Sequence, residues 1–295
     1  MTPMKNLQSL LTGNGPIITD GAWGTQLQAL GLSSGECPDA WNLTHPDLVE
    51  RVASMYVEAG SKVILTNTFR SNRIALESYG LAAKTQELNK AGVSISRKAA
   101  GTRAKVFASM GPSGKILMSG DVTEEELASA FAEQAQALAA AGADAIVIET
   151  MSDLAEAKLA VAASRATGLT VVASMVFDSG KDHDRTMMGA TPEQVASELV
   201  AAGADVIGAN CGLGIEGYIP ICKRLRAATD RPIWIKPNAG LPELINGKII
   251  YNTTPEHFAD QTRHLRDAGA TFIGGCCGTS PAFIRSVVGI LEPSR

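Results

Sequence analysis

Short apolar segments alternate with longer amphipathic segments along the chain. Several of the short segments are apolar without interruption, as in Ala-Ile-Val-Ile at 145–148, a pattern typical of parallel strands that are covered on both faces. The pattern predicts eight strands, at 17–20, 63–69, 106–110, 145–150, 170–177, 206–211, 232–238 and 272–277. Strands that alternate with helices in this way indicate an α/β protein with a parallel sheet.

The segments between the predicted strands carry signals that begin and end helices. Thr123 with Glu126 and Thr191 with Gln194 have the spacing of capping boxes, in which the two side chains satisfy free backbone N–H groups of the first turn. In four places a glycine follows the helical segment and precedes the next strand, where its left-handed conformation ends a helix without steric strain. These glycines are Gly60, Gly142, Gly203 and Gly269.

Eight strand and helix units predict one domain, a (β/α)8 TIM barrel that extends over residues 1–295. The alternative is a doubly wound sheet of about six or more strands. The barrel is favoured because the strand count is eight and because no Gly-x-Gly-x-x-Gly motif follows the first strand, where a dinucleotide-binding fold needs it. The first strand ends instead in Asp-Gly-Ala-Trp-Gly-Thr at 20–25.

Composition and charge exclude several classes of protein. With 45% hydrophobic and 19% charged residues, the chain can bury a full core and is not intrinsically disordered. The net charge of −4 comes without a cluster of basic residues, so neither nucleic acid nor a membrane surface is an expected partner. No apolar run is long enough to span a bilayer. The five cysteines and an amino terminus without a secretory signal predict a cytoplasmic protein with reduced thiols.

Three of the five cysteines lie at the ends of predicted strands. Cys211 closes the sixth strand, and Cys276 and Cys277 close the eighth. The reactive groups of a barrel gather at the carboxyl ends of its strands, and zinc binds thiolates readily, so we predict a catalytic three-thiolate zinc site with one open position. Neighbouring side chains on a regular strand point to opposite faces, but the glycines around the pair, including Gly274 and Gly275, would permit an irregular strand end that turns both sulfurs toward one point. A structural metal site and plain burial of the thiols are the alternatives.

A zinc ion with three thiolate ligands carries a net charge of −1, which makes it a weak activator of water. It suits a thiol as its further ligand, because a thiol that coordinates a metal loses its proton. A free thiol has a pKa of about 8.5 and is mostly protonated at neutral pH. The predicted reaction is therefore attack by a substrate thiolate on an electrophilic carbon.

Six short motifs, in order along the chain, resemble those of the homocysteine S-methyltransferase family. They are DGAWGT at 20–25, TNTF at 66–69, IET at 148–150, GANCG at 208–212, KPNAG at 236–240 and GGCCGT at 274–279. The resemblance is strongest to the homocysteine-binding zinc module of cobalamin-dependent methionine synthase. It implies a zinc-dependent barrel that transfers a methyl group to homocysteine and forms methionine, with Cys211, Cys276 and Cys277 as the zinc ligands.

The same resemblance implies which residues bind homocysteine. Asp20 and Glu149 would hold its amino group, and the backbone from Gly21 through Ala22 to Thr25 would hold its carboxylate. Both roles agree with simple chemistry, because carboxylates form charge-assisted hydrogen bonds with an ammonium group and a glycine-rich turn that opens a helix offers N–H groups to an anion. The alternative for Asp20 is that it only caps the following helix.

Two asparagines and one lysine complete the candidate site. The resemblance places Asn238 where an asparagine can approach zinc when substrate is absent. Asn67 either orients the pocket or only ties down a loop, as asparagines at strand ends often do. Lys236, in the seventh strand, supports a different enzyme hypothesis, in which it forms a Schiff base as in barrel aldolases. That hypothesis leaves the three cysteines without a function.

The sequence does not identify the methyl donor. Betaine-dependent members have an aromatic residue where this chain has Arg70 and a long tail after the cysteine pair, whereas only 18 residues follow Cys277 here. We expect the donor to come from outside the chain, as a methyl-corrinoid protein, a methylfolate or a small onium compound. The alternative function is a non-catalytic subunit that binds zinc and homocysteine and presents the thiol to a methyl-corrinoid partner.

Overall fold

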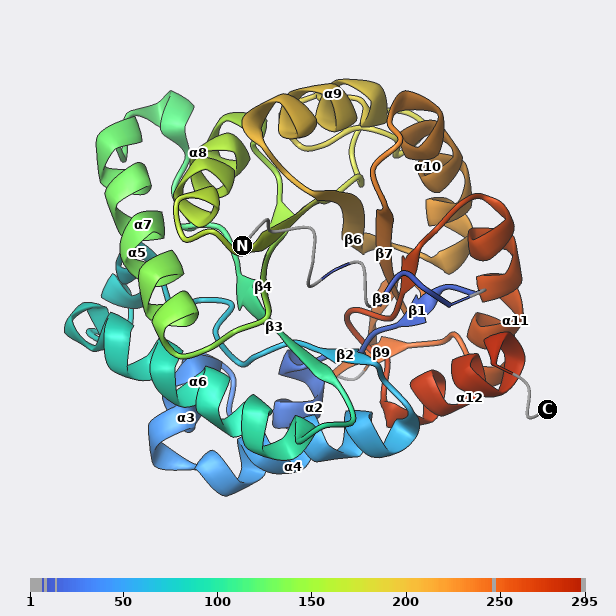
Figure 1. Ribbon diagram of the computed structural model, residues 1–295, viewed down its shortest axis with the longest axis horizontal. Coiled ribbons are helices and arrows are strands. Elements are labelled where there is room, and N and C mark those ends of the chain that lie inside the picture. The colour runs from blue at the N-terminus through green and yellow to red at the C-terminus, as the bar shows by residue number, and fades with distance from the viewer. Residues whose placement is uncertain (1–6, 8–9, 14, 246–247, 293–295) are drawn as a thin grey trace.

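The computed structural model describes residues 7, 10–13, 15–245 and 248–292, and it forms a closed barrel of parallel strands (Figure 1). The barrel strands are β1 (Ile17–Ile18), β2 (Val63–Ile64), β3 (Lys105–Met110), β4 (Ala145–Met151), β5 (Thr170–Met175), β6 (Val206–Gly214), β7 (Ile233–Asn238) and β10 (Phe272–Ile273). They pair in the order β1-β10-β7-β6-β5-β4-β3-β2. A parallel bridge between Thr19 and Val63 joins β1 to β2 and closes the ring. The predicted (β/α)8 architecture is confirmed.

Helices cover the outside of the barrel, one or more after each strand (Figure 1). The long ones are α4 (Pro46–Ala59), α6 (Thr85–Ala100), α7 (Glu124–Ala140), α8 (Leu154–Arg165), α9 (Pro192–Ala202), α10 (Ile215–Ala228), α11 (Pro255–Asp267) and α12 (Pro281–Leu291). Shorter helices are α2 (Gly24–Ala29), η1 (Pro38–Ala40), α3 (Trp41–Thr44), α5 (Arg73–Glu77), η2 (Ala82–Lys84) and η3 (Leu117–Ser119). Within the described part of the chain, none of these helices is both long and apolar enough to cross a bilayer.

The helix signals of the sequence are present as physical contacts. Thr123 and Glu126 form a complete capping box at the start of α7, and Thr191 and Gln194 form another at the start of α9. Gly203 ends α9 with a φ of 107°, a conformation that side chains with a Cβ rarely adopt. The capping boxes and the glycine therefore lie at the helix ends that the sequence predicted.

The core has an inner and an outer layer. Alternate strand residues, such as Ile18 and Ile64, pack outward against the helices, while their neighbours pack into the barrel. The barrel interior contains three aromatic side chains, Phe107, Trp234 and Phe272, whose ring centroids lie 5.3–6.4 Å apart. Aromatic pairs at this separation contribute about 0.5–1.5 kcal/mol each beyond their burial. This packed interior leaves the carboxyl ends of the strands as the place for a site.

The first two strands extend only over Ile17–Ile18 and Val63–Ile64, shorter than the predicted 17–20 and 63–69. Two further differences follow. The eighth predicted strand, 272–277, is regular only over Phe272–Ile273, although Gly274 still donates to the Ile235 carbonyl at 3.1 Å and Gly275 to the Asp20 carbonyl at 3.0 Å. A side chain at Gly274 or Gly275 would collide with Thr19 or Thr279. The sequence analysis also missed an antiparallel hairpin after β7, formed by β8 (Pro242–Ile245) and β9 (Lys248–Tyr251). Both differences lie beside the cysteines.

Candidate active site

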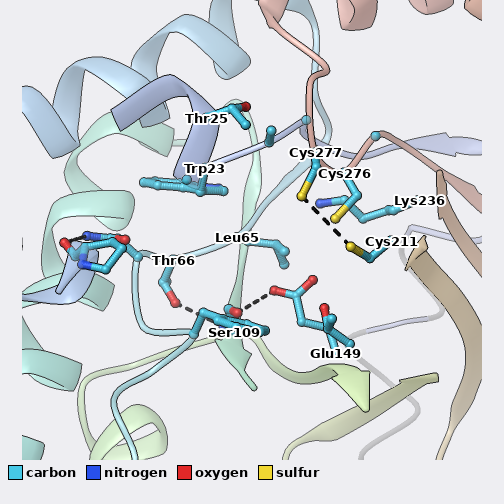
Figure 2. A pocket seen from close by; sticks show the side chains of 18 of the residues that line it. Trp23, Thr25, Leu65, Thr66, Ser109, Glu149, Cys211, Lys236, Cys276 and Cys277 are labelled. Carbon is cyan, nitrogen blue, oxygen red and sulfur yellow. Dashed lines mark hydrogen bonds between the residues drawn. The ribbon is translucent and has the colours of Figure 1, made fainter. Parts of the chain in front are cut away.

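A cavity of about 340 Å³ opens at the carboxyl ends of the strands (Figure 2). This volume is at the small end of the range for ligand pockets, about 300–1,000 Å³. Most residues of the predicted site line it: Gly21, Ala22, Thr25, Asn67, Glu149, Cys211, Cys276 and Cys277. Asp20 and Asn238 are buried and are not among the residues that line it.

The three predicted cysteines meet on one side of the cavity (Figure 2). Their sulfur atoms all lie within 4.8 Å of one another, and the Sγ atoms of Cys211 and Cys277 are 3.9 Å apart. Two sulfurs bound to one tetrahedral zinc ion at about 2.3 Å would be about 3.8 Å apart. The donor atoms and their spacing therefore fit a zinc ion.

Backbone hydrogen bonds hold the cysteine pair in its turn after β10. The N–H of Cys276 donates to the Pro237 carbonyl at 2.7 Å, and the N–H of Ala239 donates to the Cys277 carbonyl at 2.9 Å. The Thr279 hydroxyl donates to the Cys276 carbonyl at 2.7 Å. These bonds join the turn to the end of β7, so both sulfurs can face Cys211 although the two cysteines are adjacent in sequence.

The thiols are poorly disposed to ionise together without a cation. A hydrogen bond with Cys211 is the largest effect on the pKa of Cys276, and it raises that pKa together with burial. A hydrogen bond with Cys211 lowers the pKa of Cys277, but Cys276 and burial outweigh it and raise the pKa to about 12. A divalent cation would reverse this penalty, because it binds the thiolate form.

Asp20 forms a buried ion pair with Lys236. Its Oδ1 accepts from the Lys236 Nζ at 2.5 Å, and its Oδ2 accepts from the Trp23 indole N–H and the Leu65 backbone N–H, each at 2.7 Å. Asp20 does not cap α2, whose first turn has no side-chain cap. The capping alternative is therefore wrong. Both carboxylate oxygens already have protein partners, so Asp20 holds the site together whether or not it also contacts substrate.

Glu149 is one of the carboxylates that line the cavity. It is 8% exposed, and its Oε1 accepts from the Ser109 hydroxyl at 2.5 Å. Burial raises the pKa of Glu149, and the charge of Lys236 partly offsets this effect. The arrangement leaves the second oxygen to an incoming cation such as an ammonium group, whose charge would favour the ionised form.

The other predicted residues divide into two kinds. The Asn67 side chain donates to the Pro38 carbonyl at 2.8 Å and to Asn42 Oδ1 at 3.0 Å, so it ties the loop after β2 to η1 and α3. The Oγ1 of Thr25 and the Oδ1 of Asn238 are buried, and neither has a hydrogen-bond partner within the described residues. A buried polar atom without a partner is costly, and of these two residues Thr25 lines the cavity, where a ligand could supply the missing hydrogen bond.

Sequence reasoning missed two features of the site. Asp39, in η1, lines the cavity, and burial raises its pKa to about 6. Thr150 also lines it, with a φ of 61° that is strained for a β-branched residue. Asp39 carries no sequence signal, because it is buried by contacts with the loop after β2. Thr150 follows Glu149 directly, and both its position at a strand end and its place in the IET motif at 148–150 were available signals.

A profile of the family described as Homocysteine S-methyltransferase matches residues 17–291. The chain belongs to the homocysteine S-methyltransferase family. The resemblance inferred from the six motifs is therefore confirmed, and the predicted class of enzyme is the one that the family's description names.

Among curated members of the family, methionine synthase of Mycobacterium tuberculosis (strain ATCC 25618 / H37Rv) is 32% identical over 299 residues, which cover 95% of this chain and 25% of the relative. Methionine synthase of Mycobacterium leprae (strain TN) is 31% identical over 287 residues, which cover 92% of this chain and 24% of the relative. This family member thus spans about a quarter of the length of those relatives. The metallated form of the homocysteine methyltransferase MmuM from Escherichia coli has a TM-score of 0.81 at 24% identity, covering 96% of this chain and 99% of that one, which shows a shared fold.

Proposed function

We propose that this chain is a zinc-dependent S-methyltransferase that moves a methyl group from an external donor to the thiolate of homocysteine and forms methionine. The observation that carries the proposal is the meeting of three thiols, from β6 and from the turn after β10, at one wall of the cavity. The relatives named methionine synthase support the same reaction, and the homocysteine methyltransferase MmuM, which shares the fold, has been obtained in a metallated form.

In the proposed reaction, Cys211, Cys276 and Cys277 would hold the zinc ion. When bound there, zinc would lower the pKa of the homocysteine thiol so that it ionises at neutral pH. The thiolate sulfur then forms a bond to the methyl carbon, and the bond between that carbon and the donor breaks, leaving its electron pair on the donor. The protein positions the acceptor for this displacement and supplies no covalent intermediate of its own.

The cavity offers groups for both ends of the amino acid. Glu149 would accept hydrogen bonds from the ammonium group through its second oxygen, since Ser109 occupies the first. The Thr25 hydroxyl, buried and without a partner within the described residues, would donate to the carboxylate beside the turn that starts at Gly21. Asp20 would act on the ammonium group mainly by neutralising the positive charge of Lys236, with which it forms an ion pair.

Arg70 bears on the identity of the donor. It lines the cavity with Phe69, and its side chain is exposed to solvent. A guanidinium stays positively charged at all relevant pH values and repels a cationic donor. The proposal therefore favours a methyl-corrinoid protein or a methylfolate over a small onium compound. The chain would act as the acceptor-binding barrel in a reducing compartment such as the cytoplasm, because the site needs three free thiols.

Zinc and homocysteine binding test the site. Wild type should bind one zinc ion and lose it on substitution of Cys277→Ala, and homocysteine should then no longer bind. Cys222→Ala is the matched control, because Cys222 is a buried cysteine in α10 outside the cavity. If C277A bound zinc and homocysteine as well as C222A does, the assignment of the site would be wrong.

Turnover tests the reaction. The zinc-loaded chain is incubated with homocysteine and, in turn, methylcobalamin, a methylfolate, S-methylmethionine and betaine, and methionine is measured. Methionine from one of these donors supports catalysis by the chain. Binding of homocysteine without methionine from any donor would favour the alternative, a subunit that presents the thiol to a methyl-corrinoid partner.

The aldolase hypothesis has little support in the geometry. The Lys236 side chain is 3% exposed and pairs with Asp20 at 2.5 Å. A Schiff-base lysine must present its amino group to a carbonyl substrate, and here that group is buried and bonded to the Asp20 carboxylate. Borohydride with carbonyl substrates should therefore trap no adduct on Lys236.

A further inference from the structure

One buried amide connects the strained backbone of the site to the cysteines. Asn210 lies in β6 directly before Cys211 and is completely buried. Its Oδ1 accepts from the Thr150 N–H at 2.9 Å and from the Ser174 hydroxyl at 2.7 Å. Its Nδ2 donates to the Thr150 hydroxyl at 2.8 Å and reaches the Cys276 sulfur at 3.9 Å. The side chain thus joins the ends of β4 and β5 and the cysteine turn.

The orientation of this amide is set by chemistry. A backbone N–H can only donate, so the atom that faces the Thr150 N–H at 2.9 Å must be the amide oxygen. The NH2 group then points to the other side, toward the Thr150 hydroxyl and the sulfur of Cys276. Tyr218 fixes the main chain of the same residue, because its hydroxyl donates to the Asn210 carbonyl at 3.0 Å.

The backbone on both sides of this contact is strained. Thr150 has a φ of 61° and Cys211 a φ of 63°, which are left-handed values for residues other than glycine. Such values persist only where the surroundings hold them, and they cluster at functional sites. Here the Asn210 side chain makes both hydrogen bonds to Thr150. The second strained residue, Cys211, directly follows Asn210 in the sequence.

We propose that Asn210 is a positioning residue of the metal centre, which donates an N–H to the Cys276 sulfur and holds Thr150 in its strained conformation. The proposal rests on the zinc site proposed above. An N–H that points at a ligand sulfur stabilises its negative charge and fixes its direction. Partners of this kind typically account for about 10–100-fold in metal affinity. The role differs from ligation, because Asn210 acts through Cys276.

The experiment measures metal binding and a spectroscopic signature. Zinc affinity is determined by competition with a chromophoric chelator, and the thiolate-to-metal charge-transfer band is recorded with cobalt in place of zinc. Asn210→Ala should bind zinc about 10–100-fold more weakly, and its cobalt band should move to longer wavelength because the sulfur loses a hydrogen bond. Ser174→Ala, which removes a different bond to the same amide, should leave the band in place and zinc affinity within about threefold.

A double variant separates the two parts of the proposed role. Glycine adopts a positive φ without strain, so in Thr150→Gly the backbone no longer needs the hydrogen bonds from Asn210 to keep its conformation. N210A with T150G should regain thermal stability relative to N210A but regain neither zinc affinity nor the band position. If N210A does not fold, Asn210→Asp at pH 8 replaces it, because a carboxylate still accepts from Thr150 and Ser174 but has no N–H for the sulfur.

Three results would overturn the proposal. Wild-type zinc affinity and an unshifted band in N210A or N210D would show that Asn210 does not act on Cys276. Recovery of zinc affinity in the double variant would show that it acts only on the backbone. Absence of the charge-transfer band in wild type would refute the zinc site itself, and the role of Asn210 with it. This failure of the proposed function is distinguishable from failure of the Asn210 role, because it is seen in wild type before any substitution is made.

Discussion

Replacing Asp39 with asparagine is expected to make the protein more stable at neutral pH. The carboxyl group is 1% exposed, and its Oδ2 accepts from the Ser71 hydroxyl at 2.6 Å and from the Arg70 N–H at 2.8 Å. An amide oxygen accepts both of these hydrogen bonds. The substitution therefore preserves the contacts and removes only the cost of a buried charge.

The size of the effect follows from the pKa. Burial raises the pKa of Asp39 from 3.8 to about 6 in the folded state. Between these pH values the unfolded chain releases the proton while the folded chain retains it, so stability falls as pH rises, and the loss is complete above the folded pKa. At about 1.4 kcal/mol for each pKa unit, the difference amounts to about 3 kcal/mol.

The assay is urea unfolding of wild type and D39N at several pH values from 4 to 8. The free energy of unfolding of D39N should exceed that of wild type by about 3 kcal/mol at pH 8, and the difference should vanish near pH 4. Asp47→Asn, at the exposed start of α4, is the control and should change stability by less than about 1 kcal/mol. A difference between D39N and wild type that is constant with pH would refute the reasoning.

Three further substitutions test other parts of the structure. Lys236→Met leaves Asp20 buried without its partner and should lower the free energy of unfolding by about 3–5 kcal/mol, measured by chemical denaturation; a loss below about 1 kcal/mol would contradict the ion pair. Glu149→Gln should weaken homocysteine binding about 10–100-fold in calorimetry through loss of a charge-assisted bond, with zinc affinity unchanged. Thr191→Ala removes the cap of α9 and should lower stability by about 1 kcal/mol, and an unchanged melting temperature would argue against the capping box.

The sequence predicted those parts of the molecule that depend on local patterns. The barrel follows from the repeated strand and helix signals, and the cysteine cluster follows from the rule that strand ends share one face of a barrel. Asp39 could not be found in this way, because its burial depends on Arg70 and Ser71, about thirty residues further along. The hairpin formed by β8 and β9 had a usable signal, the Asn-Gly pair at 246–247 in the sequence, which is typical of hairpin turns.

The strained conformations were also beyond sequence reasoning. Thr150 has strong β propensity, and nothing in its neighbours indicates a positive φ. The conformation is held by Asn210, which is 60 residues away in the chain. Departures from local preference of this kind occur where tertiary contacts over-determine the backbone, and here they coincide with the candidate site.

The order of the strands has a consequence for when the proposed metal site can form during synthesis. The strand β7 lies between β6, which carries Cys211, and β10, which precedes Cys276 and Cys277. When the ribosome has made the first six barrel strands, only one of the three thiols has been synthesised, and the three-thiol cluster cannot yet form. The cluster exists only after residue 277 has emerged and the last strand has paired with the first. Metal loading would thus be a final step of folding, and a chain that stalled before that point would have no three-thiol site to fill.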